Sequence, residues 1–251
     1  MRLVRVFVDG DVRYGLADEE TVTLISDEPF AAWEPDGELE LADARLLAPV
    51  VATKVVCVGL NYRSHAEELG VPLPEEPVIF LKPATSVVGP GADIVLPEEV
   101  GRVDHEAELA AVIGRRTHRV SPDEAARCIL GYTCANDVTA RDIQRLDGQW
   151  TRAKGFDTFC PLGPWADTEL DPSDVAVECF VNGERRQSAR TSDMIRTPAE
   201  IVAFASHVMT LLPGDVVLTG TPGGIGPIRD GDSVEVRIEG LGSLINPVER
   251  Q

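Results

Sequence analysis

Residues 106–114 read Glu-Ala-Glu-Leu-Ala-Ala-Val-Ile-Gly, an apolar run that begins with two acidic side chains. Its length and its β-branched residues predict a buried strand that starts at Glu106. Side chains at i and i+2 of a strand point to the same face, so Glu106 and Glu108 are expected to aim at one point. A buried carboxylate needs a metal ion or a cationic side chain as partner. His105 would face the opposite way and is expected to be structural.

A third carboxylate follows a second apolar run, Cys128 to Ala135, which ends just before Asn136 and Asp137. Asp137 therefore lies where a strand would end and could reach the same point. Three carboxylates without thiols suit a hard cation, Mg²⁺ or Mn²⁺, with Ca²⁺ also possible. The sequence predicts a metal site made of Glu106, Glu108 and Asp137.

Strands and turns dominate the rest of the pattern, which predicts a mixed β (α+β) fold, a β-sandwich or roll rather than a Rossmann sheet. Alternating residues on either side of Asp9-Gly10 predict a hairpin, with a third strand at 21–25 and an acidic, loop-rich segment at 26–44. We interpret residues 1–48 as a small β-rich N-terminal domain and 49–251 as the catalytic domain. Asn182-Gly183 predicts another hairpin, and 234–238 is expected to be the last strand.

Two segments carry clear helix start signals. Ser121-Pro122 opens a helix expected to reach about Leu130, and Thr197-Pro198 opens one that runs through Met209.

The chain has 42 acidic and 23 basic residues and a formal net charge of −19. Nucleic acids and anionic membranes require a basic surface, so neither is expected as a partner. The five cysteines form no Cys-x-x-Cys pair and lie mostly in apolar segments, which favours reduced, buried thiols in a cytoplasmic protein. No signal-peptide core fits the N-terminus, and no apolar run reaches the roughly 18 residues of a membrane span.

Polar residues elsewhere could complete a site. His65 and Glu68 are spaced i and i+3 on a short predicted helix that ends at Gly70, so they can touch, and a carboxylate raises the basicity of a histidine. Arg141 and Gln144 share a helical turn, and arginine binds carboxylates through a bidentate fork. Lys154 is expected in a loop. Lys82 is either a site cation or a surface lysine, and a glycine-rich turn around Thr221 could bring backbone close to a substrate.

Six pieces of sequence, in order, resemble the fumarylacetoacetate hydrolase family in its short bacterial and mitochondrial branch. They cover roughly residues 50 to 248 and are Gly59 to His65, Phe80 to Pro83, Asp104 to Leu109, Asn136 to Gln144, Lys154 to Pro164 and Leu218 to Pro222.

This resemblance implies the family fold, a homodimer and a divalent metal. It also implies a mobile lid carrying His65 and Glu68, a catalytic Lys154, and substrate contacts from Arg141, Gln144 and Thr221. Long-branch members resemble a four-carboxylate site, but Asn61 stands in that neighbourhood here, so we expect three ligands.

We therefore expect an enzyme that acts on a small 2-oxo acid through a metal-stabilised enolate. The pair of His65 and Glu68, which could activate water, favours hydrolysis of acylpyruvate-type acids or decarboxylation of oxaloacetate-type acids. The alternative is isomerisation, tautomerisation or decarboxylation of unsaturated 2-hydroxy or 2-oxo dicarboxylic acids of aromatic catabolism. A smaller alternative is a non-catalytic binding protein.

Overall fold

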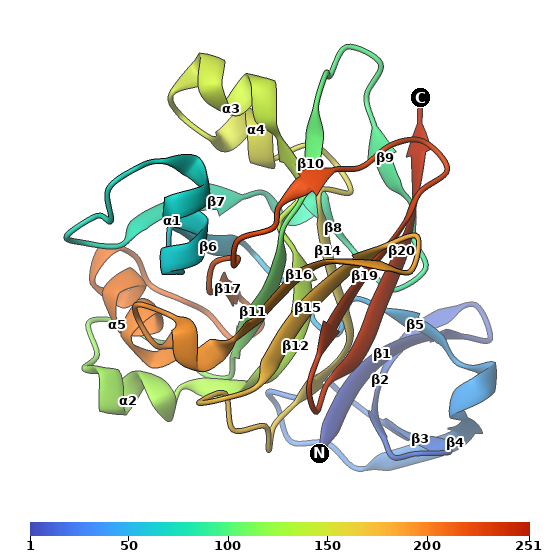
Figure 1. Ribbon diagram of the computed structural model, residues 1–251. Helices are drawn as coiled ribbons and strands as arrows, with labels where there is room; N and C mark the ends of the chain where they lie inside the picture. Colours follow the sequence, from blue (N-terminus) through green and yellow to red (C-terminus); the bar gives the residue numbers. More distant parts are fainter.

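A twelve-stranded mixed sheet forms the centre of the computed structural model, which describes residues 1–251 (Figure 1). Its strands lie in the order β4-β3-β2-β1-β14-β12-β11-β17-β6-β7, with β5 beside β1 and β8 beside β14. The bounds are β1 Arg2–Val8, β2 Asp11–Ala17, β3 Thr21–Ile25, β4 Pro35–Glu40, β5 Arg45–Leu47, β6 Val55–Gly59, β7 Val78–Lys82, β8 Val87–Val88, β11 Ala107–Ile113, β12 Ile129–Asn136, β14 Cys160–Asp167 and β17 Val216–Leu218.

A five-stranded sheet, in the order β16-β15-β19-β20-β9, packs against the central strands. Its strands are β9 Ile94–Leu96, β15 Ala176–Val181, β16 Glu184–Arg190, β19 Ser233–Ile238 and β20 Gly242–Arg250. The largest apolar core lies between the two sheets and joins Leu109 and Cys134 of the first to Val177, Val236 and Leu244 of the second. This confirms a β-rich fold of packed sheets.

A small three-stranded sheet lies next to the site and has the order β13-β10-β18. These strands are β10 Val103–His105, β13 Thr139–Ala140 and β18 Gly226–Pro227.

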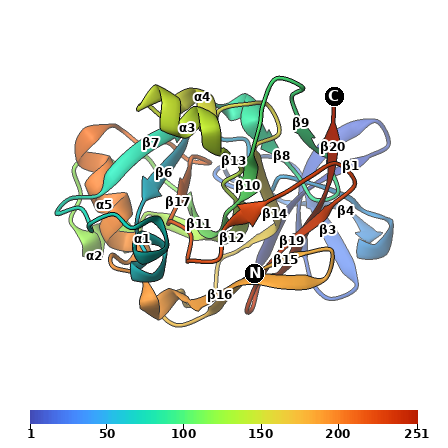
Figure 2. The same ribbon diagram turned by 45° about the horizontal axis from the view of Figure 1, so that its top comes forward.

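Five short α-helices flank the sheets. They are α1 Arg63–Leu69, α2 Pro122–Ala126, α3 Arg141–Asp147, α4 Thr151–Lys154 and α5 Pro198–Val208, and 3₁₀ turns span Leu41–Asp43, Ala84–Ser86 and Thr191–Asp193. Capping boxes begin α2 at Ser121 and α5 at Thr197, as predicted. In Figures 1 and 2, α1, α2 and α5 lie on one side of the central strands and β1–β4 lie on the other.

The N-terminal hairpin forms as predicted, with its turn at Asp9 and Gly10, both at positive φ. It joins the central sheet because Arg2 and Leu3 of β1 pair with Asp167 and Ala166 of β14. Residues 26–44 are not all loop, because β4 pairs with β3 there. β4 is an exposed edge strand, so it lacks the apolar alternation that would have indicated it.

Three other boundaries differ from expectation. The first predicted helix ends at Ala126 rather than near Leu130, because β12 begins at Ile129. Lys154 ends the helix α4 and does not lie in a loop. The last strand is not 234–238 but β20, which pairs with β19 and with β9. The side-chain amide of its Asn246 is buried and donates hydrogen bonds to the carbonyls of Gly89 and Ala92.

No helix in this structure combines the length and the apolar character needed to cross a membrane.

Candidate metal centre

The three predicted carboxylates meet where β11 and β12 lie side by side. Ala107 pairs with Asn136, which brings Glu106 and Glu108 next to Asp137. One oxygen from each carboxylate lies within 4.8 Å of the others, and all three side chains are buried. Contrary to the prediction, Glu106 is not the first residue of the long strand but links β10 to β11.

Hydrogen bonds from the main chain fix this corner. The amide of Glu106 donates to Oδ1 of Asn136 at 2.9 Å, and the amide of Asp137 donates to the carbonyl of Glu106 at 2.9 Å. The two chain segments therefore hold each other at the point where the carboxylates project.

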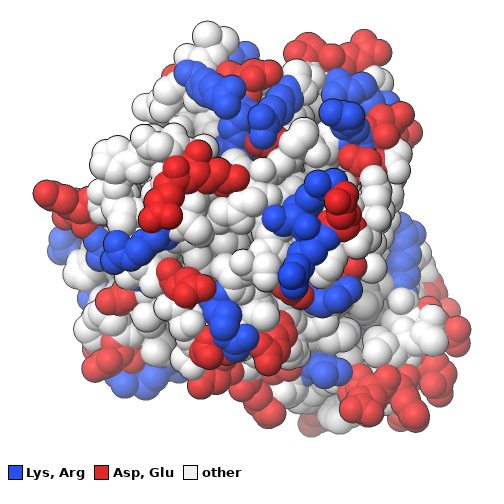
Figure 3. Space-filling model, in the orientation of Figure 1, with Lys and Arg blue, Asp and Glu red and all other residues white.

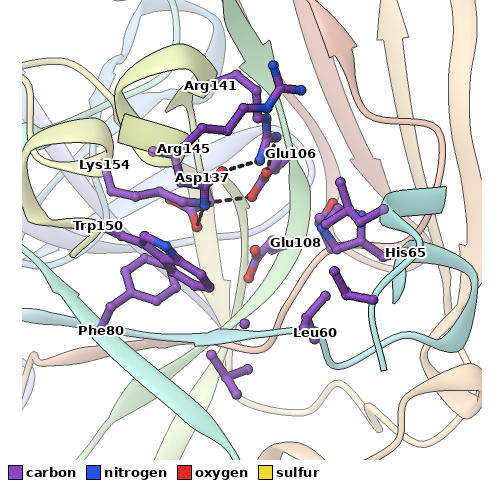
Figure 4. Close-up of a pocket in the computed structure, with 16 residues that line it drawn as sticks. Leu60, His65, Phe80, Glu106, Glu108, Asp137, Arg141, Arg145, Trp150 and Lys154 are labelled. Atoms are coloured by element: carbon purple, nitrogen blue, oxygen red, sulfur yellow. Dashed lines mark hydrogen bonds and ion pairs between the residues drawn. The ribbon is translucent and has the colours of Figure 1, made fainter. Parts of the chain in front are cut away.

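Buried cations surround two of the three carboxylates (Figure 4). The ammonium of Lys154 lies 2.7 Å from Glu106 and 2.6 Å from Asp137, and that of Lys82 lies 2.6 Å from the other oxygen of Asp137. Arg141 donates from Nη2 to Glu106 at 2.5 Å and from Nε to the buried Asp104 at 2.9 Å. Burial opposes the charge of Lys154, but Asp137 and Glu106 outweigh it and raise its pKa above the ordinary value.

Glu108 differs from the other two carboxylates because no cationic side chain contacts it. Its Oε2 accepts a hydrogen bond from the amide of Gly220 at 2.6 Å. Burial, followed by the charges of Asp137 and Glu106, raises its pKa well above the ordinary value. For Glu106, burial alone would raise the pKa, yet Lys154 and Arg141 together lower it.

The four buried carboxylates of the centre, which include Asp104, have unequal partners. Lys82, Arg141 and Lys154 are buried cations that contact Asp104, Glu106 and Asp137, and the half-exposed Arg102 also binds Asp104 at 2.7 Å. Glu108 alone contacts no cationic side chain. An all-carboxylate donor set in which one buried member lacks a cationic partner fits a hard divalent cation.

The centre opens into a cavity of about 380 Å³. Apolar side chains form its walls, among them Leu60, Leu69, Val71, Phe80 and Trp150. Trp150 meets Phe80 edge to face, with ring centroids 5.1 Å apart, and Lys154 lies 5.0 Å from the centroid of the Phe80 ring. A small organic ligand fits such a space, with its polar end toward the carboxylates.

His65 reaches the cavity from α1, as Figure 4 shows, and is buried. Its Nδ1 lies 3.4 Å from Oε2 of Glu68, so the predicted pair forms, although the contact is long. Both oxygens of Glu68 also accept from the amide of Gly224, at 3.1 and 3.2 Å, which ties α1 to the glycine-rich loop.

The remaining predicted residues also line the cavity. Gln144 accepts a hydrogen bond from Nη1 of Arg141 at 2.6 Å. Thr221 donates to the carbonyl of Ala107 at 2.8 Å and accepts from Nε2 of Gln187 at 2.8 Å. His105 faces away from the centre, as expected, with its Nδ1 3.1 Å from Gln187. Asn61 is buried but bonds to Arg196 and Thr219, not to the carboxylates.

Several residues of the centre had weak or no signals in the sequence. The structure decides the role of Lys82, which is a buried cation of the site and not a surface lysine. Phe80, Trp150 and Arg145 line the cavity, yet nothing in their local pattern separated them from ordinary core or surface residues. These residues lie far apart in the sequence and come together only in the folded chain, so a local sequence pattern could not identify them.

The fold and the site are those of a known protein family. Residues 54–249 match the family described as fumarylacetoacetate (FAA) hydrolase C-terminal, and the chain belongs to this family. Residues 1–49 match a second family, described as Rv2993c-like, N-terminal.

The chain is similar to several particular proteins. Protein Rv2993c of Mycobacterium tuberculosis is 52% identical over 248 residues, covering 97% of this chain and 93% of that one. The oxaloacetate tautomerase FAHD2B, mitochondrial, of Bos taurus is 45% identical over 223 residues, covering 84% of this chain and 71% of that one. The crystal structure of a 5-carboxymethyl-2-hydroxymuconate delta-isomerase from Mycobacterium smegmatis superimposes with a TM-score of 0.94 at 51% identity, covering 100% of both chains.

Proposed function

We propose that this protein is a divalent-metal-dependent enzyme that moves a proton within a short 2-oxo acid, interconverting its keto and enol forms or shifting its double bond. The observation that carries this proposal is the arrangement of the cavity: three carboxylates and Lys154 on one side and His65 on another. Negative charge that develops on the substrate oxygen would be stabilised by Lys154 and by a cation held by the carboxylates. The proton that leaves carbon would be accepted by His65.

A divalent cation, for which Mg²⁺ or Mn²⁺ is the best candidate and Ca²⁺ a weaker one, would act as a Lewis acid that polarises the substrate's oxygens. Glu106, Glu108 and Asp137 would hold it. Lys154 would add a positive charge near the same oxygens, and Gln144 and Thr221 would orient the ligand. The apolar walls would exclude bulk water, which strengthens each of these interactions.

His65 is the proton-transfer group of this mechanism. Its imidazole can accept a proton and return it at a different atom, which is sufficient for a tautomerase or isomerase. Relatives named as an oxaloacetate tautomerase and as a muconate delta-isomerase support the same class of reaction.

A second candidate is hydrolysis or decarboxylation of the same acids. The contact between His65 and Glu68 favours it, because a carboxylate behind a histidine helps the ring to activate water. The contact is 3.4 Å long and Glu68 also binds the amide of Gly224, so this support is weaker.

A substrate panel followed by ultraviolet absorbance tests both candidates. Oxaloacetate, acetylpyruvate, fumarylpyruvate and a 2-hydroxy-dienoate would each be incubated with Mg²⁺, with chelator, and with Glu106→Ala. We expect turnover on the order of 1–10³ s⁻¹ on one of them, abolished by chelator and by the substitution. An isomer as product supports the first candidate, and cleavage products or CO₂ support the second. Turnover that survives both treatments would refute the mechanism.

A further inference from the structure

The cavity contains three cationic side chains, and two of them are already engaged. Arg141 uses all three of its nitrogens, bonding to Asp104, Glu106 and Gln144. Lys154 bridges Glu106 and Asp137. Arg141 and Lys154 both pair with carboxylates of the centre. Neither side chain is therefore free to bind a further anionic group, such as a carboxylate at the far end of a ligand.

Arg145 is different, because its guanidinium forms no hydrogen bond. Its nearest acidic oxygen belongs to Asp142, 3.7 Å away, and both side chains are mostly exposed, at 67% and 58%. An exposed pair at this distance contributes little and is easily exchanged for a better partner. The N–H donors of Arg145, a residue that lines the cavity, therefore form no hydrogen bond within the chain.

The fold brings Arg145 to the cavity. Arg141 and Arg145 are four residues apart on α3, so they lie on the same face of that helix. Figure 4 shows the extended side chain of Arg145 beside that of Arg141, at the upper edge of the labelled residues. Figure 3 shows that basic side chains gather over α3 and α4, whereas acidic side chains gather over the N-terminal strands at the lower right.

Arg145 is the one cationic side chain of the cavity that forms no hydrogen bond. Much of the remaining lining is apolar or aromatic, as at Leu60, Phe80 and Trp150. A ligand carboxylate that lay against these side chains would lose its water without gaining a hydrogen bond. Arg145 can supply the charge-assisted, bidentate contact that such a group needs.

We propose that Arg145 binds the distal carboxylate of a dicarboxylic 2-oxo acid and thereby selects dicarboxylates over monocarboxylates. This inference rests on the proposed function, because it takes the 2-oxo acid end of the substrate to lie at the carboxylate centre. Arg145 is a specificity residue in this scheme and takes no part in proton transfer.

Calorimetric binding in the presence of Mg²⁺ tests this without relying on turnover. The probes are oxaloacetate and 2-oxoglutarate, each compared with its own ω-methyl ester, which keeps the 2-oxo acid end but loses the distal charge. We expect the wild-type protein to bind at least one diacid about 10–100-fold more tightly than its ester, the range of a charge-assisted contact. Arg145→Gln should abolish this preference and leave ester binding unchanged, and Arg145→Lys should restore part of it.

Arg152→Gln is the matched control, because Arg152 is also exposed, lies on α4, bonds to Asp147 and does not line the cavity. It should leave the preference intact. Oxalate, which has no distal carboxylate, should bind Arg145→Gln as well as it binds the wild type, showing that the centre is undisturbed.

The inference is overturned if the wild type shows no preference for either diacid, or if the preference survives Arg145→Gln. A different result would refute the proposed reaction but not the role of Arg145. In that result, Arg145→Gln loses the preference for the diacid over its ester, and the wild type turns over no substrate of the panel.

Discussion

At the scale of single residues, Glu106 and Glu108 are two buried carboxylates with opposite surroundings. Glu106 contacts Arg141 and Lys154, whereas Glu108 contacts a main-chain amide. We expect Glu106→Gln to lower the stability of the metal-free protein by about 3–5 kcal/mol, because it leaves buried cations without a partner. Glu108→Gln should change it by less than about 1 kcal/mol, because no ion pair is broken.

Urea denaturation in the presence of chelator measures the change in unfolding free energy of each variant. The increase in Tm that Mg²⁺ gives the wild type should be absent from both variants. Equal destabilisation by the two substitutions would contradict this account of the charges.

Lys82 gives a second prediction at this scale. It binds one oxygen of Asp137 and the carbonyl of Val138 from within the core. Lys82→Met should destabilise the metal-free protein by about 3–5 kcal/mol, since Asp137 loses a buried partner. Mg²⁺ should recover part of this loss by supplying the missing charge, so its thermal shift should be larger than in the wild type.

Lys54 is the control, because it pairs with the buried Asp215 away from the centre. Lys54→Met should also destabilise the protein, but Mg²⁺ should give it no extra recovery. The interpretation fails if Mg²⁺ rescues both variants equally.

At the scale of elements, the glycine-rich loop holds α1 beside the site. The amides of Gly223 and Gly224 donate to Ser64 and Glu68 on that helix. Gly224 has a φ of +97°, and a Cβ there would lie 2.3 Å from the carbonyl oxygen of Arg186. Gly224→Ala should therefore cost about 1–2 kcal/mol of backbone strain and a further 1–3 kcal/mol from the clash, and it should raise KM by displacing α1.

Gly231 separates these two effects, because it has a φ of +81° but a methyl group there would meet only open space. Gly231→Ala should cost the strain alone and leave KM unchanged. Urea denaturation and steady-state kinetics of both variants provide the comparison, and equal losses of stability would argue against the clash.

The elements also show where prediction from sequence succeeds. Hairpins at Asp9-Gly10 and Asn182-Gly183 and the starts of α2 and α5 depend on neighbouring residues, so local patterns sufficed. β4 was missed because it is an exposed edge strand without apolar alternation. β20 was missed although Asn246 lies within it: the side-chain amide of that residue is buried and donates to two carbonyls that are distant in the sequence. Strand periodicity and the position of Asp137 after an apolar run predicted that three carboxylates would meet, as they do, whereas the places of Lys82 and Arg145 at the centre and the cavity depend on the folded arrangement, which no local pattern contains.

At the scale of the whole molecule, the centre joins separate parts of the fold. Its carboxylates and cations come from β7, β11, α3, α4, the link between β10 and β11, and the segment after β12. A ligand that binds only the folded state stabilises the entire chain, by about 2.7 kcal/mol at one hundred times its Kd. For a chain of this size we expect Mg²⁺ with oxalate, a planar mimic of an enolate, to raise Tm by about 5–10 °C.

Differential scanning calorimetry with Mg²⁺, with oxalate, with both and with chelator measures this linkage. Oxalate should have no effect once chelator is present. Stabilisation by oxalate that persists in chelator would place its binding away from the carboxylates.

The pairing of β1 with β14 has a consequence for how the chain folds. Arg5 to Phe7 pair with the nearby β5, but Arg2 and Leu3 pair with Asp167 and Ala166, so the start of the first strand is covered only after β14 has been synthesised. The hairpin of β1 and β2 can form early from local contacts, but its docking on β14 is a late event of high sequence separation. During translation the start of β1 is open to other strands, and the acidic side chains that gather over the N-terminal strands would repel other copies of the chain until β14 arrives.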